Sequence, residues 1–325
     1  MLFRSSGMGG DNPCVYALTV YDNKLIAGGY FTAAGGTAAN SIAAWDGSSW
    51  SPLGSGMDNP IRALNVYNNK LIAGGTFSTA GGTAANNIAA WDGFSWSPLG
   101  SGMNLDVRAL TVYDNKLIAG GSFTTVGGTS ASLIAAWDGS SWSPLGSGMS
   151  GDDYPYVFAL TVYDNKLIAG GWFTTAGGVA ANYIAVWDGY SWSPLGSGMG
   201  GDDYLYIEAL TVYNNELIAG GRFRTAGGTS ASRIAAWDGS SWSPLGSGIN
   251  TPVSALTVYD NKLIAGGGFN LSGQTHVHCI AAWDGSSWSP LGSGIDYHIN
   301  ALTVYDNKLI AGGFFTTTGD RKSVV

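Results

Sequence analysis

The chain has little of what several protein classes depend on. Its 325 residues include two cysteines, three histidines and only 11% charged residues. Two cysteines, Cys14 and Cys279, cannot make a disulfide framework. A net charge of −8 argues against nucleic-acid binding, which needs a basic surface. No apolar run approaches the length of a membrane span, and no apolar stretch follows the N-terminal residues as in a secretory signal. We therefore expect no nucleic-acid partner and no membrane insertion.

Repetition is what the chain has in abundance. The segment Ala-Leu-Thr-Val-Tyr, altered only by Asn65, recurs at steps of 46 or 50 residues, with its alanine at Ala17, Ala63, Ala109, Ala159, Ala209, Ala255 and Ala301. A second signature, Trp-Asp-Gly followed by Ser-Trp-Ser-Pro-Leu-Gly, starts at Trp45, Trp91, Trp137, Trp187, Trp237 and Trp283. There are thus seven first halves and six second halves. A period in the forties with two turn signals per unit is typical of propeller blades.

Each unit is predicted to form four short strands. Residues 15–21 and 25–31 are rich in β-branched and aromatic side chains, and Asp22-Asn23 between them suits a two-residue turn. Residues 42–45 form a third strand, which Asp46-Gly47 turns into a fourth around Trp50. No helical periodicity competes with this pattern. The fold class that the sequence predicts is all-β.

These residues resemble a known repeat. The run Leu25-Ile26-Ala27-Gly28-Gly29 ends in a glycine doublet, the pair Trp45-Asp46 follows, and Trp50 comes five residues after Trp45. That order is similar to the kelch repeat, although kelch usually has Tyr where this chain has Trp and has a longer turn between the aromatics. The resemblance covers nearly the whole chain. It implies a β-propeller of four-stranded antiparallel blades and says little about function, because propellers host many activities.

The repeat predicts one closed domain over residues 1–325, most simply a seven-bladed propeller with an incomplete last blade. The units are residues 14–57, 58–103, 104–149, 150–199, 200–249, 250–295 and a partial 296–325. Residues 1–4 match the tail of a fourth strand, but the last blade lacks a source for its third strand. Three interpretations stand equal. The ring closes imperfectly, the open edge near Phe314 and Phe315 pairs with another chain in self-association, or the gene product is truncated.

Four columns of the repeat vary while the rest is nearly constant. One follows the glycine doublet (Tyr30, Thr76, Ser122, Trp172, Arg222, Gly268, Phe314), and one precedes the third strand (Ser41, Asn87, Leu133, Tyr183, Arg233, Cys279). Two lie at the start of the first strand: Cys14, Pro60, Asp106, Tyr156, Tyr206, Pro252, His298, and Tyr16, Arg62, Arg108, Phe158, Glu208, Ser254, Asn300. Because strands alternate in direction, all four columns share one face. Variation on one face of a rigid scaffold indicates a binding surface, with drift of loop positions as the alternative.

The side chains of these columns point to a protein or carbohydrate ligand. Tyr, Trp and Arg dominate interface hot spots, and aromatics beside Asp and Asn suit sugars. A lectin-like site would use Trp172, Tyr183, Tyr156 and Tyr206, and a protein-interaction scaffold would add Arg62, Arg108, Arg222 and Arg233. The full set of candidate ligand-binding residues is Tyr156, Phe158, Trp172, Tyr183, Tyr206, Arg222, Arg233, Tyr30, Arg62 and Arg108.

Catalysis and metal binding have weaker support. All three histidines fall in neighbouring units, so His276, His278, Cys279 and His298 are candidates for a zinc or copper site, although we expect no cofactor. A hydrolase needs matched carboxylates or a nucleophile with its base, and Glu208 and Glu216 have no evident partner. The sequence favours a non-catalytic binding or scaffold protein. The alternatives are an oxidase-like enzyme using the histidine cluster, and a recently amplified repeat without a settled ligand.

Overall fold

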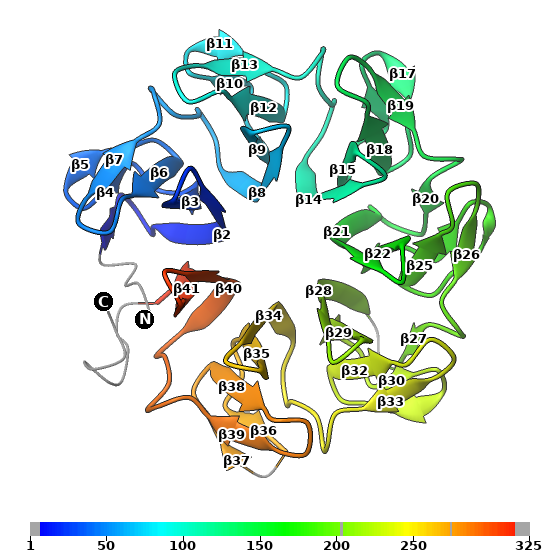
Figure 1. Ribbon diagram of the computed structural model, residues 1–325. Helices are drawn as coiled ribbons and strands as arrows, with labels where there is room; N and C mark the ends of the chain where they lie inside the picture. The colour runs from blue at the N-terminus through cyan, green and yellow to red at the C-terminus, as the bar shows by residue number, and fades with distance from the viewer. Residues whose placement is uncertain (1–6, 202–203, 274, 316–325) are drawn as a thin grey trace.

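The computed structural model describes residues 7–201, 204–273 and 275–315, and in this part of the chain the regular structure is β-sheet. Six four-stranded antiparallel sheets and one two-stranded sheet stand in a ring (Figure 1), and the inner strands of all seven line a central channel. Each sheet is one blade, numbered 1 to 7 along the chain. The predicted all-β propeller is confirmed. No helix in the described part is long and apolar enough to cross a membrane.

The first strand of every blade is innermost, and these strands pack against one another around the channel. They are β2 (Cys14–Tyr21), β8 (Ile61–Tyr67), β14 (Val107–Tyr113), β21 (Tyr156–Tyr163), β28 (Tyr206–Tyr213), β34 (Val253–Tyr259) and β40 (His298–Tyr305). The second strands are β3 (Lys24–Tyr30), β9 (Lys70–Gly75), β15 (Lys116–Gly121), β22 (Lys166–Trp172), β29 (Glu216–Arg222), β35 (Lys262–Gly267) and β41 (Lys308–Phe314).

Blades 1 to 6 have two further strands. The third strands are β6 (Ile42–Trp45), β12 (Ile88–Trp91), β18 (Ile134–Trp137), β25 (Ile184–Trp187), β32 (Ile234–Trp237) and β38 (Ile280–Trp283). The fourth, outermost strands are β7 (Trp50–Pro52), β13 (Trp96–Pro98), β19 (Trp142–Pro144), β26 (Trp192–Pro194), β33 (Trp242–Pro244) and β39 (Trp288–Pro290). Proline is tolerated there because the outer edge needs no backbone donor.

Small hairpins between the second and third strands were not predicted from the sequence. They are β4 (Ala33–Ala34) with β5 (Thr37–Ala38), β10 (Thr79–Ala80) with β11 (Thr83–Ala84), β16 (Thr125–Val126) with β17 (Thr129–Ser130), β23 (Thr175–Ala176) with β24 (Val179–Ala180), β30 (Thr225–Ala226) with β31 (Thr229–Ser230), and β36 (Leu271–Ser272) with β37 (Thr275–His276). In blades 1, 4 and 5 a short strand joins the hairpin: β1 (Met8–Gly9), β20 (Met149–Ser150) and β27 (Met199–Gly200).

Tight turns define one face of the ring, which we call the turn face. Asp22 and Asn23 both have positive φ, 49° and 55°, as the two-residue hairpin between first and second strands requires. In the turn between third and fourth strands the Asp46 carboxylate accepts hydrogen bonds from the Ser48 and Ser49 amides, each 2.8 Å long. These bonds hold the pKa of Asp46 well below its usual range. The opposite face, carrying the variable columns, is the loop face.

Glycine doublets at the ends of the second strands allow neighbouring blades to pack closely. A Cβ on Gly28 would approach Cγ2 of Ile61 in the next blade to 2.7 Å, and a Cβ on Gly29 would collide with the Cys14 carbonyl of its own blade. Since real Cβ atoms do not pack so closely, the doublet is required by two contacts at once: one between blades and one within a blade.

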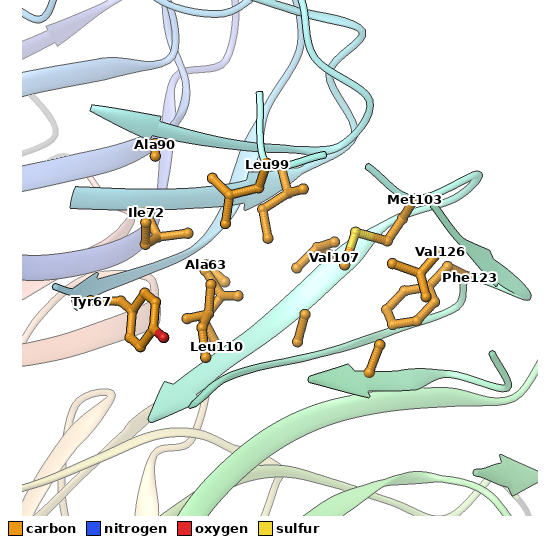
Figure 2. Packing of buried hydrophobic residues seen from close by; sticks show 14 of the residues in the cluster. Ala63, Tyr67, Ile72, Ala90, Leu99, Met103, Val107, Leu110, Phe123 and Val126 are labelled. Carbon is orange, nitrogen blue, oxygen red and sulfur yellow. The ribbon is translucent and has the colours of Figure 1, made fainter. Parts of the chain in front are cut away.

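Cores form between consecutive blades. In the cluster between blades 2 and 3, Ile72 and Leu99 meet Val107, Leu110 and Phe123 from the next blade (Figure 2). Tryptophans join the outer parts of the same interfaces. Nε1 of Trp192 donates to the Leu145 carbonyl of the preceding blade at 2.9 Å, and the same bond recurs at Trp96, Trp142, Trp242 and Trp288. The repeat therefore stabilises the ring blade against blade.

The ring closes through the two-stranded blade 7. A Cβ on Gly312 would lie 2.6 Å from Cγ1 of Val15, the same approach that Gly28 makes to Ile61. Tyr305 donates its hydroxyl to the Asn23 carbonyl at 3.1 Å, repeating the bond from Tyr21 to Asn69 across an ordinary interface. Blade 7 therefore closes the ring at its inner two strands, where it repeats the contacts of an ordinary interface. The predicted roles of residues 1–4 and of the segment after Phe315 lie outside the described residues.

Candidate ligand-binding site at the channel mouth

Every inner strand carries a β-bulge at the same place. In blade 1 the register shifts between Val15 and Ala17, which leaves Tyr16 as the extra residue, and the same shift recurs in all seven blades. An extra residue has no partner across the ladder, and a bulge re-aims its side chain. The seven extra residues, which we call the mouth residues, are Tyr16, Arg62, Arg108, Phe158, Glu208, Ser254 and Asn300.

These seven side chains meet at the loop-face end of the channel. They alone line a cavity of about 230 Å³. Below it a second cavity of about 220 Å³ is walled by the invariant alanines and leucines of the inner strands, such as Ala17 and Leu18, together with most of the mouth residues. Seven copies of one position thus converge on one cavity although they differ in type, except that two are arginine. The alanines and leucines that line the rest of the channel are the same in every blade.

The cationic part of the mouth belongs to blades 2 and 3. The Arg62 guanidinium lies 3.9 Å over the Tyr16 ring, and the Nε of Arg62 is buried without a hydrogen-bond acceptor. Arg108 donates from Nε and Nη2 to Oδ2 of Asp106, at 3.2 and 3.0 Å. Among the described residues Arg62 has no carboxylate partner of this kind. The two arginines therefore differ, since the charge of Arg108 is balanced and that of Arg62 is not.

An aromatic cluster adjoins Arg108. Tyr156 stacks on Phe158 with ring centroids 5.1 Å apart and 9° between planes, and Tyr206 meets Phe158 edge-on at 6.0 Å. The Arg108 guanidinium lies 4.8 Å from the centroid of Tyr156 and 5.6 Å from that of Phe158. Stacking and cation–π contacts fix these side chains in place, which gives the mouth a rigid apolar wall.

A hydrogen-bond chain crosses blades 5, 6 and 7 on the other side. Ser254, 7% exposed, donates from Oγ to Oε2 of Glu208 at 3.0 Å, and its Oγ lies 3.0 Å from Nε2 of His298. Burial raises the pKa of Glu208 and lowers the pKa of His298. With the Ser254 proton directed at Glu208, neutral His298 donates from Nε2, and the chain runs from the imidazole through the hydroxyl to the carboxylate.

Gly268 makes room for this histidine. A Cβ at Gly268 would come within 2.7 Å of Nδ1 of His298, and the φ of Gly268 is not in the left-handed region. The position after the glycine doublet carries a side chain in every other blade, from Tyr30 to Phe314. A glycine here therefore serves the neighbouring blade, because the imidazole occupies the space that a side chain would fill.

The predicted residues split between the mouth and the surface around it. Arg62, Arg108 and Phe158 line the cavity, and Tyr156 and Tyr206 support it. Trp172 and Arg222 pair across the strands with Tyr156 and Tyr206. They flank Tyr204, whose ring lies 6.1 Å from the Trp172 ring and 6.0 Å from the Arg222 guanidinium carbon. Tyr30 pairs with Cys14 and is exposed.

Tyr183 and Arg233 belong to a strained column before the third strand. Its six residues all have left-handed backbones, with φ of 69° at Tyr183 and 67° at Arg233. Arg233 donates from Nη1 to the carbonyl of Phe223 at 2.8 Å, which fixes the end of its own blade's second strand. Left-handed non-glycine residues cost free energy, and such strain clusters at functional sites.

Sequence reasoning left out four mouth residues, namely Tyr16, Glu208, Ser254 and Asn300. All four stand in the same variable column as Arg62, Arg108 and Phe158, so the column itself was the signal. Glu208, Ser254 and Asn300 are not of the types Tyr, Trp and Arg that the sequence argument preferred, whereas Tyr16 is of such a type and was still left out. Tyr204 was likewise missed, although it is 67% exposed between two predicted residues.

The predicted metal cluster is not assembled. No group of three or more His, Cys, Asp or Glu side chains within the described ranges is arranged to hold a metal ion. His276 and His278 are exposed on either side of buried Val277, whereas His298 is partly buried at the mouth and bonded to Ser254. Cys279 is half-buried, and burial raises the pKa of its thiol to about 11. Of the four, His278, Cys279 and His298 border one cavity of about 660 Å³ between blades 6 and 7, but within the described ranges they are not gathered as metal ligands.

The cations of the chain are divided between the two faces. Every described arginine (Arg62, Arg108, Arg222, Arg224, Arg233) is on the loop face, and every described lysine (Lys24, Lys70, Lys116, Lys166, Lys262, Lys308) follows a turn on the turn face. Guanidinium groups recognise carboxylates and stack on aromatic rings, which ammonium groups do less well. The loop face is thus the face equipped for specific polar contacts.

Comparison with known proteins agrees with the fold. The model of a domain of unknown function, DUF5122, described as a β-propeller, matches residues 114–135 and 164–185. Both segments run from the turn after a first strand to the start of the third strand, in blades 3 and 4. A search of curated proteins finds no match.

Several solved structures share this shape but are distant in sequence. The computationally designed Ika8 protein is 20% identical over 96% of each chain, with a TM-score of 0.56. The WD40 β-propeller domain of Doa1 is 14% identical, covering 99% of this chain and 98% of that one, with a TM-score of 0.61. The extracellular domain of the putative one component system BT4673 from B. thetaiotaomicron is 12% identical, covering 95% of this chain and 39% of that one, with a TM-score of 0.64. The chain is a β-propeller repeat protein, and these matches do not single out the kelch repeat.

Proposed function

We propose that this propeller is a non-catalytic binding protein whose ligand sits on the loop face at the channel mouth. The observation that carries the proposal is the ring of seven bulges. A scaffold kept nearly identical in every copy aims seven largely different side chains into one cavity. Binding sites are concave, with few convergent polar groups, and they sit on rigid elements.

The hydrogen-bond chain favours binding over catalysis. A nucleophilic serine needs a base that takes its proton, but the Ser254 hydroxyl donates its proton to Oε2 of Glu208, and in that arrangement its Oγ is an acceptor for Nε2 of His298. No described side chain donates to or accepts from Nδ1 of His298 to orient it as a base. The three residues therefore hold one another in fixed positions, which suits recognition.

The surface around the mouth extends the proposal to a larger ligand. Tyr204, Trp172 and Arg222 form a second aromatic and cationic group on blades 4 and 5. A glycan bound at the mouth would extend over these side chains, and a protein partner would cover the same surface. A glycan ligand and a protein partner are thus separate outcomes of one experiment.

The test is a glycan array and a capture assay from the native source, run with the parent chain and two double variants. Tyr156→Ala with Phe158→Ala removes the stacked pair at the mouth. Phe94→Ala with Tyr190→Ala is the matched control, since these aromatics are 92% and 91% exposed on the turn face. Binding that is lost only in the mouth variant supports the proposal. Binding that survives in it, or that is lost in the control, contradicts the proposal.

A further inference from the structure

We infer that the ligand group held in the mouth is an acidic sugar, a single pyranose bearing a carboxylate. This inference rests on the proposed function and gives the chemical class of its ligand. Its geometry is bipolar, with the carboxylate at Arg62 in blade 2 and the ring hydroxyls at Glu208, Ser254 and Asn300 in blades 5, 6 and 7.

Arg62 is the reason to expect a carboxylate on the ligand. Its guanidinium is partly buried against Tyr16, its Nε has no acceptor, and it has no carboxylate partner among the described residues. A partly buried charge is costly unless it is paired. Arg108 in the next blade shows the same side chain already paired, with Asp106. A ligand carboxylate in the cavity would pair this charge and give Nε the acceptor that it lacks.

Glu208 restricts which anion fits. It lies across the cavity from Arg62, and its Oε2 is taken by Ser254. Because the cavity is small, a doubly charged phosphate bound at Arg62 would be repelled by this carboxylate more strongly than a singly charged carboxylate, so a phosphate ester is disfavoured. A ligand whose far end carries hydroxyl groups donates hydrogen bonds to Glu208 instead. An acid at one end and hydroxyls at the other is the composition of a uronic acid.

Size and shape agree with a single sugar ring. The cavity of about 230 Å³ corresponds to roughly eight water molecules, enough for a monosaccharide and too small for a folded peptide segment. Phe158 forms the apolar wall between the two polar arcs, and its stacking on Tyr156 keeps it in place. The C–H face of a pyranose can lie against such a ring while its hydroxyls reach the blades on either side.

The experiment measures binding of D-glucuronate, D-glucose and D-glucose 6-phosphate to the full chain by calorimetry. We expect glucuronate to bind at least about tenfold more tightly than the other two. Arg62→Gln should weaken glucuronate binding about ten- to hundredfold, since a hydrogen bond to a charged group is lost. Lys166→Gln, which removes an exposed cation from the turn face, should leave binding unchanged. If Arg62→Gln does not fold, Arg62→Lys keeps the charge without the planar fork and should still weaken binding.

Equal binding of glucose or of the phosphate ester, or full binding by the Arg62 variants, overturns the inference. The array experiment separates this failure from that of the proposed function. Loss of another ligand in the Tyr156 and Phe158 variant, with no glucuronate binding, removes the acidic-sugar assignment and leaves the mouth as a binding site. If no ligand depends on the mouth, both proposals fail.

Discussion

Adding one methyl group at Gly312 tests whether the ring is closed. Gly312 is in β41 of blade 7, and a Cβ there would lie 2.6 Å from Cγ1 and 3.0 Å from Cβ of Val15 in blade 1. Its backbone is not left-handed, so Gly312→Ala changes space and not backbone strain. If the interface exists, Val15, which is buried, must move by about an ångström to reach ordinary contact distance.

The sign of the effect depends on closure. In a closed ring, overpacking of this kind costs about 1–3 kcal/mol of unfolding free energy. In an open ring the alanine meets no neighbour, and replacing a strand glycine stabilises by about 0.4–1 kcal/mol through the unfolded chain. Urea unfolding followed by tryptophan fluorescence measures the change as a shift in midpoint, with the thirteen tryptophans as probes.

Gly120→Ala is the matched control. It would place its Cβ 2.5 Å from Cγ1 of Val157 at the interface between blades 3 and 4. We expect both variants to lower the midpoint by similar amounts. A lowered midpoint for Gly120→Ala beside an unchanged or raised one for Gly312→Ala would refute the closure that we describe between blades 7 and 1.

Three further predictions follow from single contacts. Trp192→Phe removes the buried bond to the Leu145 carbonyl and should cost about 1–3 kcal/mol in the same urea assay, whereas an unchanged midpoint would contradict the role of the indole N–H between blades. Glu208→Gln should raise the urea midpoint at pH 8 more than at pH 4. Burial raises the pKa of Glu208 in the folded protein, so the stability that the protonated side chain contributes is lost as pH rises through that pKa. An equal effect of the substitution at both pH values would count against the buried carboxylate. Gly268→Ala should displace His298 from Ser254, and an NMR titration should then show the lowered pKa of His298 rising toward its ordinary value; an unmoved titration would contradict the contact.

Much of the fold could be predicted from the sequence because the turns and strands depend on residues that are close together in the chain. The Asp22-Asn23 turn needs two positive φ angles, which Asn and Asp tolerate, and the third strand is at the predicted 42–45. The outer hairpins were not readable, since strands of two residues around Gly35 and Gly36 have no periodicity to detect. Ring closure by two strands was also beyond the sequence, because it depends on contacts between the first and last blades.

The site was predicted as a face and not as a cavity. Variation in four columns placed the binding surface on the loop face, but nothing in the spacing shows that Tyr16 and its equivalents are bulged residues. A bulge shifts the register by one residue and turns that side chain into the channel, so one of four similar columns becomes the mouth. Trp172 and Tyr183 looked equivalent to Phe158 in sequence, yet they lie outside the cavity.

Blocking the mouth with a bulky group tests the central claim most directly. Phe158→Cys puts a reactive thiol at the mouth, and Phe94→Cys puts one at an exposed position on the turn face. The native thiols Cys14 and Cys279 are buried and half-buried, with pKa values raised to about 11 by burial, so they should react slowly with a maleimide. Ligand capture should be absent from the labelled Phe158→Cys protein and kept by the labelled Phe94→Cys protein. Full capture by the labelled Phe158→Cys protein would show that the ligand binds elsewhere.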